Sequence, residues 1–508
     1  MALGMALSPA EGRGGPPEQH ETRARAFVRA SLEEISPEAD RIALIERRLR
    51  LSTFHLADRD HVGPPYATDY GDATTIDDEG ADRQIRSVSL QLATGTATVL
   101  RTVTLDGVSV TSTLKEGTVK GASRSSLASP AWWTQDPIRV LRRAADAADA
   151  EFVGDAPVHG VPARQVRFSS NGLSVKLSIA TGNLLPLAAE VVVALPADIA
   201  WSSRGDIIER TEWQNWSLVE GVRLPFQTDV FRNGEPLLSA SVEKFSINPT
   251  LGVEDFQQDA ATLQQLETPG ARDVDALPLG RPDRPIREIS QAVVQIPGGW
   301  YATAVCQPDG IVVIDAPISN GYSDKVIAEI TRRFPGTRIK AVVTTTSFNW
   351  HTAGVRSYAA RGIPIYVLDR NAGVVKALLR APHRLRPDQL SRSGRRGVIR
   401  TVSAATTIGT GATRMVLYPI SHATSPMMMV YFPNLQLLHT AEMVQPLGPG
   451  GALIFPESLR EIIDEVAARG LRVKTVIGMH MDPTPWKTVV DTLRVSSDPQ
   501  RTTLKESK

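Results

Sequence analysis

The sequence predicts an α+β protein in which an antiparallel β domain precedes a domain that mixes strands with helices. The chain has 508 residues, more than one ordinary domain holds. From about residue 85, apolar and polar residues alternate in short runs, and the Asn-Gly pairs at 171–172 and 233–234 are typical of hairpin turns. From about residue 287, strand-length apolar runs alternate with helical stripes, which predicts mixed sheets with helices packed outside them.

Changes in composition divide the chain into five segments. Residues 1–22 are rich in Gly, Pro, Glu and Arg and are expected to be disordered. Residues 23–250 should form a helix plus the antiparallel β domain, and residues 251–286 a polar, Pro-rich linker. Residues 287–498 should form the mixed domain, and residues 499–508 a disordered tail.

The first domain opens with helical spacing of its apolar residues across 23–50. The acidic stretch 58–82 that follows is predicted to be a solvated loop, because it is polar and rich in turn-forming residues. Strands with period-two alternation come next, and one helix over 136–150 interrupts them. The first domain is therefore expected to be a many-stranded sheet with little helix.

Three late segments of this domain resemble the half-barrel fold of lipoprotein-carrier proteins: "VHGVPARQVRF", "LSVKLSIATGNLLPLAAEV" and "WQNWSLVEGVRLPFQTDVFRNG". The resemblance implies a curved sheet whose concave face can hold an apolar ligand. Trp213, Trp216 and Phe226 either line such a cavity or fill the core. Core packing is favoured, because aromatic residues at strand spacing usually pack.

The second domain is predicted from alternating strands and helices. One helix should begin at Ser323, whose hydroxyl can cap it, and should stop at the Pro-Gly pair 335–336. Residues 338–346 should form a strand, and residues 427–432 a strand whose three methionines pack in the core on alternating faces. Further helices are predicted at 353–362, 372–382, 457–470 and 485–493.

Charge and composition exclude several classes of function. The net charge is +1 without a long single-sign block, so the sequence indicates no nucleic-acid partner and no anionic membrane surface. No apolar run reaches the ~20 residues of a membrane-spanning helix. The single cysteine, Cys306, excludes a disulfide within the chain and a thiolate metal cage, and it is expected to be a buried, inert thiol.

The N-terminus lacks the positive region and the full apolar core of a secretory signal, so as written the chain is expected to be cytoplasmic. If its start lies too far downstream, the same residues are the tail of a signal peptide, and the protein is periplasmic or secreted. The sequence does not indicate an oligomeric state.

Three histidines, His351, His422 and His480, lie just past the ends of predicted strands, and an acid, Glu442, follows "LQLLHTA". Strand ends in layered folds converge on one edge, where binding loops collect. Imidazole and carboxylate groups at such positions form a plausible metal shell. His439 is expected to face away from Glu442, and the remaining late histidine, His383, is expected at the surface or hydrogen-bonded.

These positions resemble the metallo-β-lactamase superfamily, in the order "DGIVVIDAP", "HTAG", "SHATS", "AEM" and "GMH" over about 287–495. The resemblance implies an αββα four-layer sandwich. It also implies a metal loop that usually reads Thr-His-x-His-x-Asp-His. In this chain Thr346 and Phe348 replace the first two histidines, Trp350 replaces the aspartate, and His351 matches the last histidine.

The resemblance implies a reduced site with one divalent metal, zinc by default and iron or manganese as alternatives. Its ligands would be His351, Glu442 and His480, with His422 as a fourth ligand or hydrogen-bonded to bound water. Glu442 and His422 are the expected catalytic residues, and Thr346, Phe348 and Trp350 (the substituted positions) are expected to line the pocket.

The implied activity is hydrolysis of a small-molecule ester, amide or lactone by a metal-activated water. The alternative is a non-catalytic protein that binds an apolar ligand without metal, because Phe348 and Trp350 are bulky enough to fill the space of the lost ligands.

Overall fold

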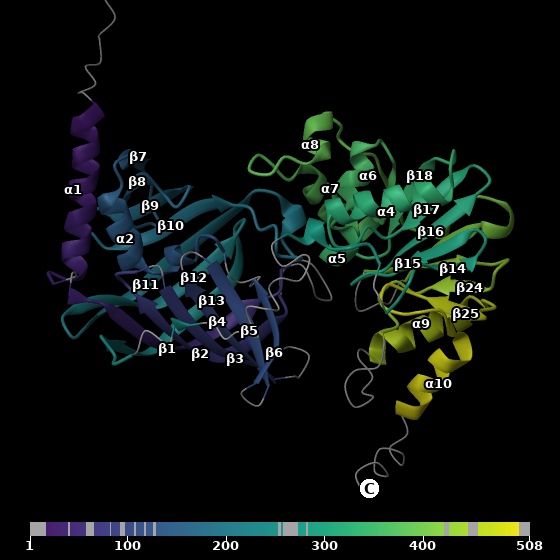
Figure 1. The fold of residues 1–508 in the computed structure, drawn as a ribbon, viewed down its shortest axis with the longest axis horizontal. Coiled ribbons are helices and arrows are strands. Elements are labelled where there is room, and N and C mark those ends of the chain that lie inside the picture. Colours follow the sequence, from purple (N-terminus) through teal and green to yellow (C-terminus); the bar gives the residue numbers. More distant parts are fainter. Residues whose placement is uncertain are drawn as a thin grey trace, which may run out of the picture.

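The computed structural model describes residues 17–38, 41–56, 66–81, 83–91, 97–105, 108–115, 118–124, 129–251, 256–257, 273–280, 283–420, 426–445 and 456–496. The described chain is a mixed α/β structure built on three sheets (Figure 1). The first half of the chain forms one large antiparallel sheet. The second half forms two smaller sheets with helices around them.

The first sheet has 13 strands in the order β6-β5-β4-β3-β2-β1-β13-β12-β11-β10-β9-β8-β7. Sequence neighbours therefore pair as hairpins, and a single long-range pair, β1 with β13, joins the two runs. The strands are β1 (Leu44–Phe54), β2 (Thr68–Asp78), β3 (Arg83–Gln91), β4 (Ala97–Leu105), β5 (Val108–Lys115), β6 (Thr118–Arg124), β7 (Glu151–Asp155), β8 (Ala163–Ser170), β9 (Leu173–Ala180), β10 (Pro186–Val193), β11 (Ile207–Val219), β12 (Val222–Arg232) and β13 (Glu235–Ile247).

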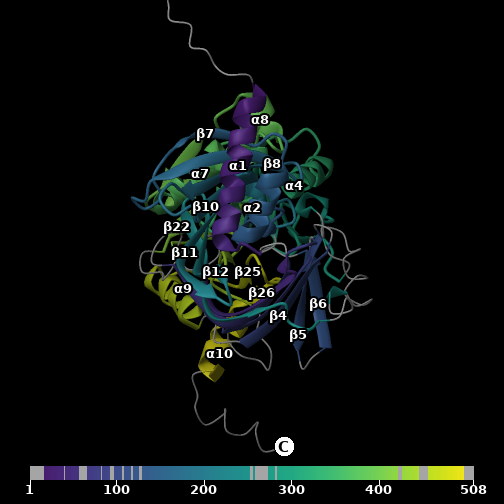
Figure 2. The same cartoon turned by 90° about the vertical axis from the view of Figure 1, so that its left-hand side faces the viewer.

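Two helices, α1 (Pro17–Ile35) and α2 (Pro137–Asp146), lie against each other on one face of this sheet (Figure 2). Apolar residues of both helices share a core cluster with the inward-facing residues of β8 to β12. Trp213 is buried in that cluster, and Trp216 and Phe226 pack against it. The core-packing interpretation of these three aromatic residues is therefore confirmed.

Three predictions for the first half are wrong. Helix α1 begins at Pro17, so residues 17–22 are helical rather than disordered. The helical pattern does not continue to residue 50, because β1 begins at Leu44. Within the predicted loop 58–82, residues 68–78 form strand β2, paired along its full length with β1.

The second sheet has seven strands in the order β14-β15-β16-β17-β18-β19-β20, antiparallel up to β17 and parallel from β17 onward. They are β14 (Arg287–Ser290), β15 (Val293–Ile296), β16 (Ala302–Gln307), β17 (Gly310–Ile314), β18 (Ile339–Thr344), β19 (Ile365–Leu368) and β20 (Ile399–Val402). The third sheet has six, in sequence order, and is antiparallel except for β24 with β25. They are β21 (Thr406–Ile408), β22 (Met415–Pro419), β23 (Met428–Phe432), β24 (Leu437–His439), β25 (Thr475–Ile477) and β26 (Thr484–Pro485).

Both of these sheets bury apolar residues on their two faces. Val312 and Ile314 of β17 share a cluster with strands of the third sheet, whereas Ile311 and Val313 pack with helices. Such double burial explains why the strands read as continuous apolar runs. The helices on the second sheet are α4 (Asn320–Arg333), α6 (Val355–Ala360) and α7 (Ala372–Arg380), and those on the third are α9 (Pro456–Ala468) and α10 (Trp486–Ser496).

The three methionines divide as predicted, since Met427 and Met429 pack towards the helices and Met428 between the sheets. The predicted cap is wrong: Ser319 accepts the N–H of Tyr322 and caps α4, while Ser323 lies buried inside the helix. Cys306 is half-buried rather than buried.

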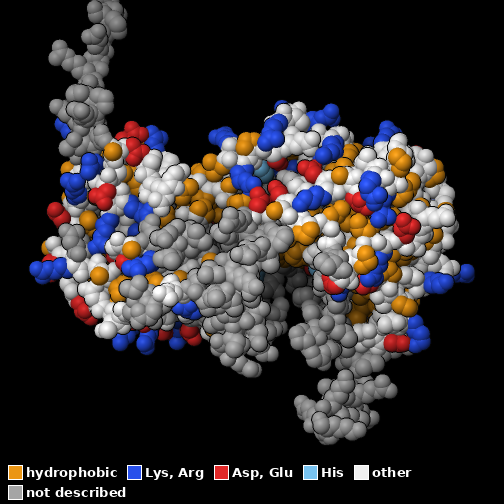
Figure 3. Space-filling model, in the orientation of Figure 1, with side chains coloured by type: hydrophobic (Ala, Val, Ile, Leu, Met, Phe, Trp, Pro, Cys, Tyr) orange, Lys and Arg blue, Asp and Glu red, His pale blue; other side chains and the backbone are white. Residues whose placement is uncertain are grey.

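Of the predicted 251–286 linker, the structure describes 251, 256–257, 273–280 and 283–286, and the predicted tail at 499–508 lies outside the described residues. No helix among the described residues is long and apolar enough to cross a membrane. On the face shown in Figure 3, basic and acidic side chains are interspersed.

Candidate metal centre

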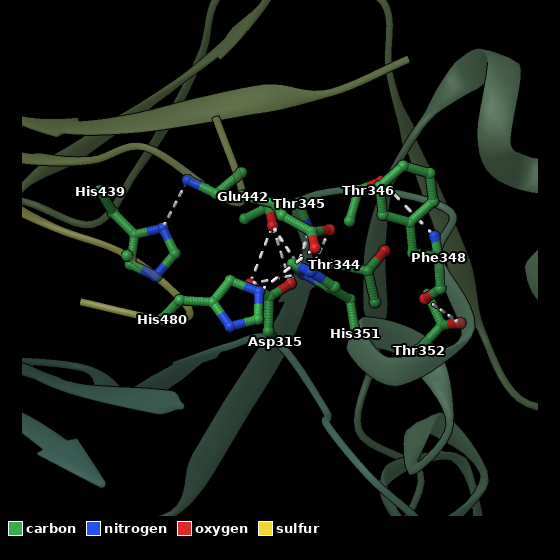
Figure 4. Close-up of polar contacts among 12 residues, drawn as sticks. Asp315, Thr344, Thr345, Thr346, Phe348, His351, Thr352, His439, Glu442 and His480 are labelled. Carbon is green, nitrogen blue, oxygen red and sulfur yellow. Dashed lines mark hydrogen bonds and ion pairs between the residues drawn. The ribbon is translucent and has the colours of Figure 1, made fainter. Parts of the chain in front are cut away.

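The candidate centre lies where two parallel strand pairs end, one pair in each of the two smaller sheets. Asp315 directly follows β17, and His351 lies in the short helix α5 (Asn349–Thr352) just after β18. Glu442 follows β24 and His480 follows β25. Because neighbouring parallel strands end at the same edge, the four side chains meet (Figure 4).

Three of the four predicted ligands are close together. Single donor atoms of His351, Glu442 and His480 all lie within 4.8 Å of one another. The Glu442 carboxylate lies between the two imidazoles, with Oε2 at 3.0 Å from Nε2 of His351 and Oε1 at 3.2 Å from Nε2 of His480. The fourth predicted ligand, His422, lies in 421–425, outside the described residues.

Asp315 sets the orientation of His351. One carboxylate oxygen of Asp315 lies 3.4 Å from Nδ1 of His351, so Nε2 faces Glu442. Thr345 fixes that carboxylate in turn, through its backbone N–H at 2.7 Å and its hydroxyl at 2.8 Å. A carboxylate behind a ligating imidazole selects the tautomer and raises the basicity of the ligand nitrogen.

The charges at the centre are strongly coupled. Burial alone would lower the pKa of His351, but the carboxylates of Asp315 and Glu442 outweigh it and raise that pKa to about 9. Burial alone would raise the pKa of Glu442, but His351 and His480 lower it to about 2. Glu442 is therefore an anion at neutral pH, and it lies between the rings of His351 and His480.

Aromatic rings enclose the centre. Trp350 stacks on Trp300 with ring centroids 5.4 Å apart, and Trp300 meets His480 edge-on at 6.2 Å. Phe348 meets His351 edge-on at 6.2 Å and belongs to the apolar core under α9 and α10. Thr346 is fully buried, and its hydroxyl accepts the N–H of Phe348. Of the three expected pocket-lining residues, Phe348 and Thr346 are thus packed inside.

A pocket of about 330 Å³ reaches the centre at His480. Its walls combine apolar groups such as Val444 and Val489 with polar groups such as Arg284, Gln445 and Asp482. Gln445 also approaches Glu442, with its amide nitrogen 3.3 Å from Oε1. This mixture is typical of sites for small molecules, which are mostly apolar with a few placed polar groups.

His439 and His383, the two late histidines that were not predicted as ligands, differ in their surroundings. His439 is fully buried near the centre, where burial and the neighbouring His351 lower its pKa to about 4, and its Nδ1 accepts the N–H of Ala441. His383 is buried rather than exposed and lies at the junction with the first sheet, 3.9 Å from Asp388. Neither belongs to the group of three close donors.

Asp315 and Thr345 were not among the predicted site residues, although Asp315 follows a strand as the candidate ligands do. The same strand-end position was therefore the signal for it. For Thr345 and Trp300 the sequence carries no signal, because their roles depend on contacts between separate strands.

No protein-family model matches the chain, and no curated protein matches it in sequence. Among solved structures, the chain is similar to a metallo-β-lactamase from Pontibacter korlensis, with 15% identity and a TM-score of 0.32 over 42% of this chain and 98% of the other. It is also similar to the metallo-β-lactamase FIM-1 from Pseudomonas aeruginosa, with 12% identity and a TM-score of 0.32 over 43% and 95%. The metallo-β-lactamase DIM-1 is similar as well, with 14% identity and a TM-score of 0.33 over 43% of this chain and 98% of the other.

The resemblance to the metallo-β-lactamase superfamily, predicted from the order of its motifs, has its counterpart in a structural likeness to several metallo-β-lactamases.

Proposed function

We propose that this protein is a metal-dependent hydrolase that holds one divalent ion, zinc by default, on His351, Glu442 and His480. The observation that carries the proposal is the convergence of these three donors beside a pocket that reaches His480. We also propose that the two smaller sheets and their helices form the αββα sandwich, and that the first sheet is of the half-barrel type.

The donor set fits a divalent ion. Zinc binds imidazole nitrogen and carboxylate oxygen at about 2.0–2.2 Å in tetrahedral geometry, so two donors of one ion lie about 3.4 Å apart. Glu442 already lies 3.0 Å and 3.2 Å from its two partners. The two imidazole nitrogens are at most 4.8 Å apart, so they need to approach by no more than about 1.4 Å. Three protein ligands leave one position open, as in catalytic sites.

A divalent ion held there would lower the pKa of a coordinated water and polarise a carbonyl oxygen. The residues of the chain do the rest. Asp315 keeps Nε2 of His351 directed at the centre, and Glu442 stays ionised at neutral pH. The stacked Trp300 and Trp350 flank the centre on the side of His480's ring edge, and the pocket that His480 lines is the proposed route for a substrate. His422 remains a proposed fourth ligand or water-binding group.

The second candidate is a protein that binds an apolar ligand without metal. It is compatible with the hydrogen bonds of Glu442 to His351 and His480, which satisfy the carboxylate from within the chain. It is also favoured by Phe348, which packs in the core next to His351.

Metal analysis of the purified protein by mass spectrometry separates the two. We expect about one equivalent of zinc, iron or manganese in the wild type and less than about a tenth in the His351→Ala/His480→Ala variant. His159→Ala is the matched control, because His159 lies on the first sheet's side of the molecule with an exposed side chain. Metal-free wild-type protein, unchanged in the double variant, would leave the binding function as the better proposal.

A further inference from the structure

A second pocket, of about 640 Å³, lies at the junction between the first sheet and the helices of the second. One wall comes from β10, β11 and the loops beside them, and the other from α7 and the segment after it. It is distinct from the pocket at His480, since the two share no lining residue.

The wall formed by β10 and β11 is apolar, although it belongs to the outer face of the sheet, where polar side chains are expected. In β10 and β11, Val191, Val193 and Ile207 belong to the buried core. Their neighbours Val192 and Ile208 point to the opposite face, because side chains alternate along a strand. These two side chains line the pocket and remain 43% and 45% exposed.

The helix wall is apolar as well. Helix α7 buries Ala372, Val375 and Leu378 against its own sheet. On its side towards the first sheet it presents Gly373, Val374 and Ala377, and a Cβ added at Gly373 meets no atom within 4 Å. Two apolar walls therefore oppose each other with open space between them. One apolar ligand chain placed there would remove both walls from water.

The polar rim carries a net positive charge. Arg204 and Arg384 both line the pocket, together with one acid, Asp206. The Asp206 carboxylate accepts the backbone N–H groups of Arg384 at 2.9 Å and Leu385 at 3.0 Å. A guanidinium presents a planar fork of donors that matches a carboxylate. An anionic head group is therefore favoured at the rim, and a cationic one is disfavoured.

We propose that this junction pocket binds one amphiphile with an unbranched apolar chain and a carboxylate head, a fatty-acid-like ligand. The chain lies between Val192 and Ile208 on one side and α7 on the other, and the head lies by the two arginines. The volume is within the range of ligand pockets, about 300–1,000 Å³. The proposal does not depend on the metal centre, and either can fail without the other.

Calorimetric titration of the full chain with dodecanoate, below its micelle concentration, tests the proposal. Dodecanol and dodecyltrimethylammonium serve as comparison ligands with the same chain. We expect saturable binding of one dodecanoate, about tenfold weaker binding of the alcohol, and no measurable binding of the cation.

Two variants with matched controls locate the site. Ala377→Trp fills the space beside α7 and should weaken dodecanoate binding at least about tenfold, whereas Lys376→Trp, on the same helix outside the pocket, should not. Arg384→Gln should reduce the preference for dodecanoate over dodecanol, whereas Arg380→Gln should not.

Failure of the wild type to bind dodecanoate would overturn the proposal. So would binding that is equal in Ala377→Trp and Lys376→Trp, since the ligand would then lie elsewhere. Equal affinity for dodecanoate and dodecanol would overturn the assignment of a carboxylate head.

Discussion

Ala441, directly before Glu442, has a backbone conformation that alanine rarely adopts. Its φ is +54°, in the left-handed region, which costs roughly 1–2 kcal/mol for a residue with a Cβ. Two backbone hydrogen bonds join this segment to β25 and the residues after it. The N–H of Thr440 donates to the carbonyl of Ile477, and the N–H of Met479 donates to the carbonyl of Ala441. The strain is maintained next to a candidate ligand, as strain often is at functional sites.

Ala441→Gly should therefore raise the free energy of unfolding by about 1 kcal/mol, measured by urea titration. The control is Ala147→Gly, at a residue with φ of −69°, where the same exchange should lower stability through added chain entropy. If both variants lose stability alike, the left-handed backbone at Ala441 is not strained.

Asp315→Asn should weaken metal binding by about 10- to 100-fold, because an amide is a weaker partner for Nδ1 of His351. Asparagine suits this position, since Asp315 has a φ of +63° and Asn tolerates that region. Competition with a chelating dye measures the affinity. Asp309→Asn, at an exposed acid one strand away, should leave the affinity unchanged.

At the scale of residues, the sequence pointed to the candidate ligands that follow strands but not to the groups that orient them. His351, Glu442 and His480 could be singled out because each lies shortly after a predicted strand, His351 beyond the loop that follows β18. Thr345 and Trp300 act through neighbours more than 20 residues away in the chain, so their contacts exist only once the sheets have formed.

At the scale of elements, strand β2 shows why burial can be misjudged from polarity. Asp77 is buried in β2 and pairs with Arg47 of β1 and with Arg139 of α2. Such pairing permits charged residues inside, so an acidic stretch that resembles a loop is a central strand. The helical spacing correctly predicted α1 and α2, each of which packs an apolar face on the sheet. It was wrong for residues 44–50, which lie in strand β1.

The C-terminal end of helix α7 is held by Arg356, a buried arginine of helix α6. Arg356 donates to the carbonyls of Leu378, Leu379 and Ala381, and it forms an ion pair with Asp388. Burial would raise the pKa of Asp388, but the hydrogen bonds from Arg356 and Ser391 hold it far below its usual value. The acid therefore stabilises the fold above about pH 4, and this contribution is lost as the pH falls below that.

Arg356→Met should lower the free energy of unfolding by about 3 kcal/mol at pH 7, because it leaves buried acceptors and a carboxylate without their cation. The difference from wild type should shrink at pH 3, where the wild type begins to lose the contribution of Asp388. Urea titration at the two pH values measures it. Arg332→Met, in an exposed pair with Glu329, should change stability by less than about 1 kcal/mol, and an equal loss there would refute the special role of Arg356.

At the scale of the whole molecule, the order of an antiparallel part and a mixed part was predictable, because hydrophobic periodicity changes from one to the other. The junction between them was not, since it is made by loops. Asp206 accepts two backbone N–H groups across it, and its own N–H donates to Pro382. No local pattern marks a loop as an interface.

Asp206→Ala should lower the free energy of unfolding by about 2 kcal/mol and should speed amide exchange at residues 384 and 385. Hydrogen–deuterium exchange with mass spectrometry measures the local effect. The control, Asp155→Ala, removes an exposed ion pair with Arg164. It should change neither the free energy of unfolding nor the exchange at 384 and 385. Unchanged exchange at 384 and 385 in Asp206→Ala would mean that the carboxylate does not hold the junction.

Asn349, two residues before His351, is held by the first half of the chain. Its side-chain N–H donates to the carbonyl of Ile199 at 2.8 Å, and its oxygen accepts the hydroxyl of Ser203 at 3.0 Å. A fragment cut at the start of the second sheet would leave this buried amide without either partner, beside the candidate ligand His351. The smallest piece of the chain that keeps the centre in order is therefore larger than the two sheets that carry it.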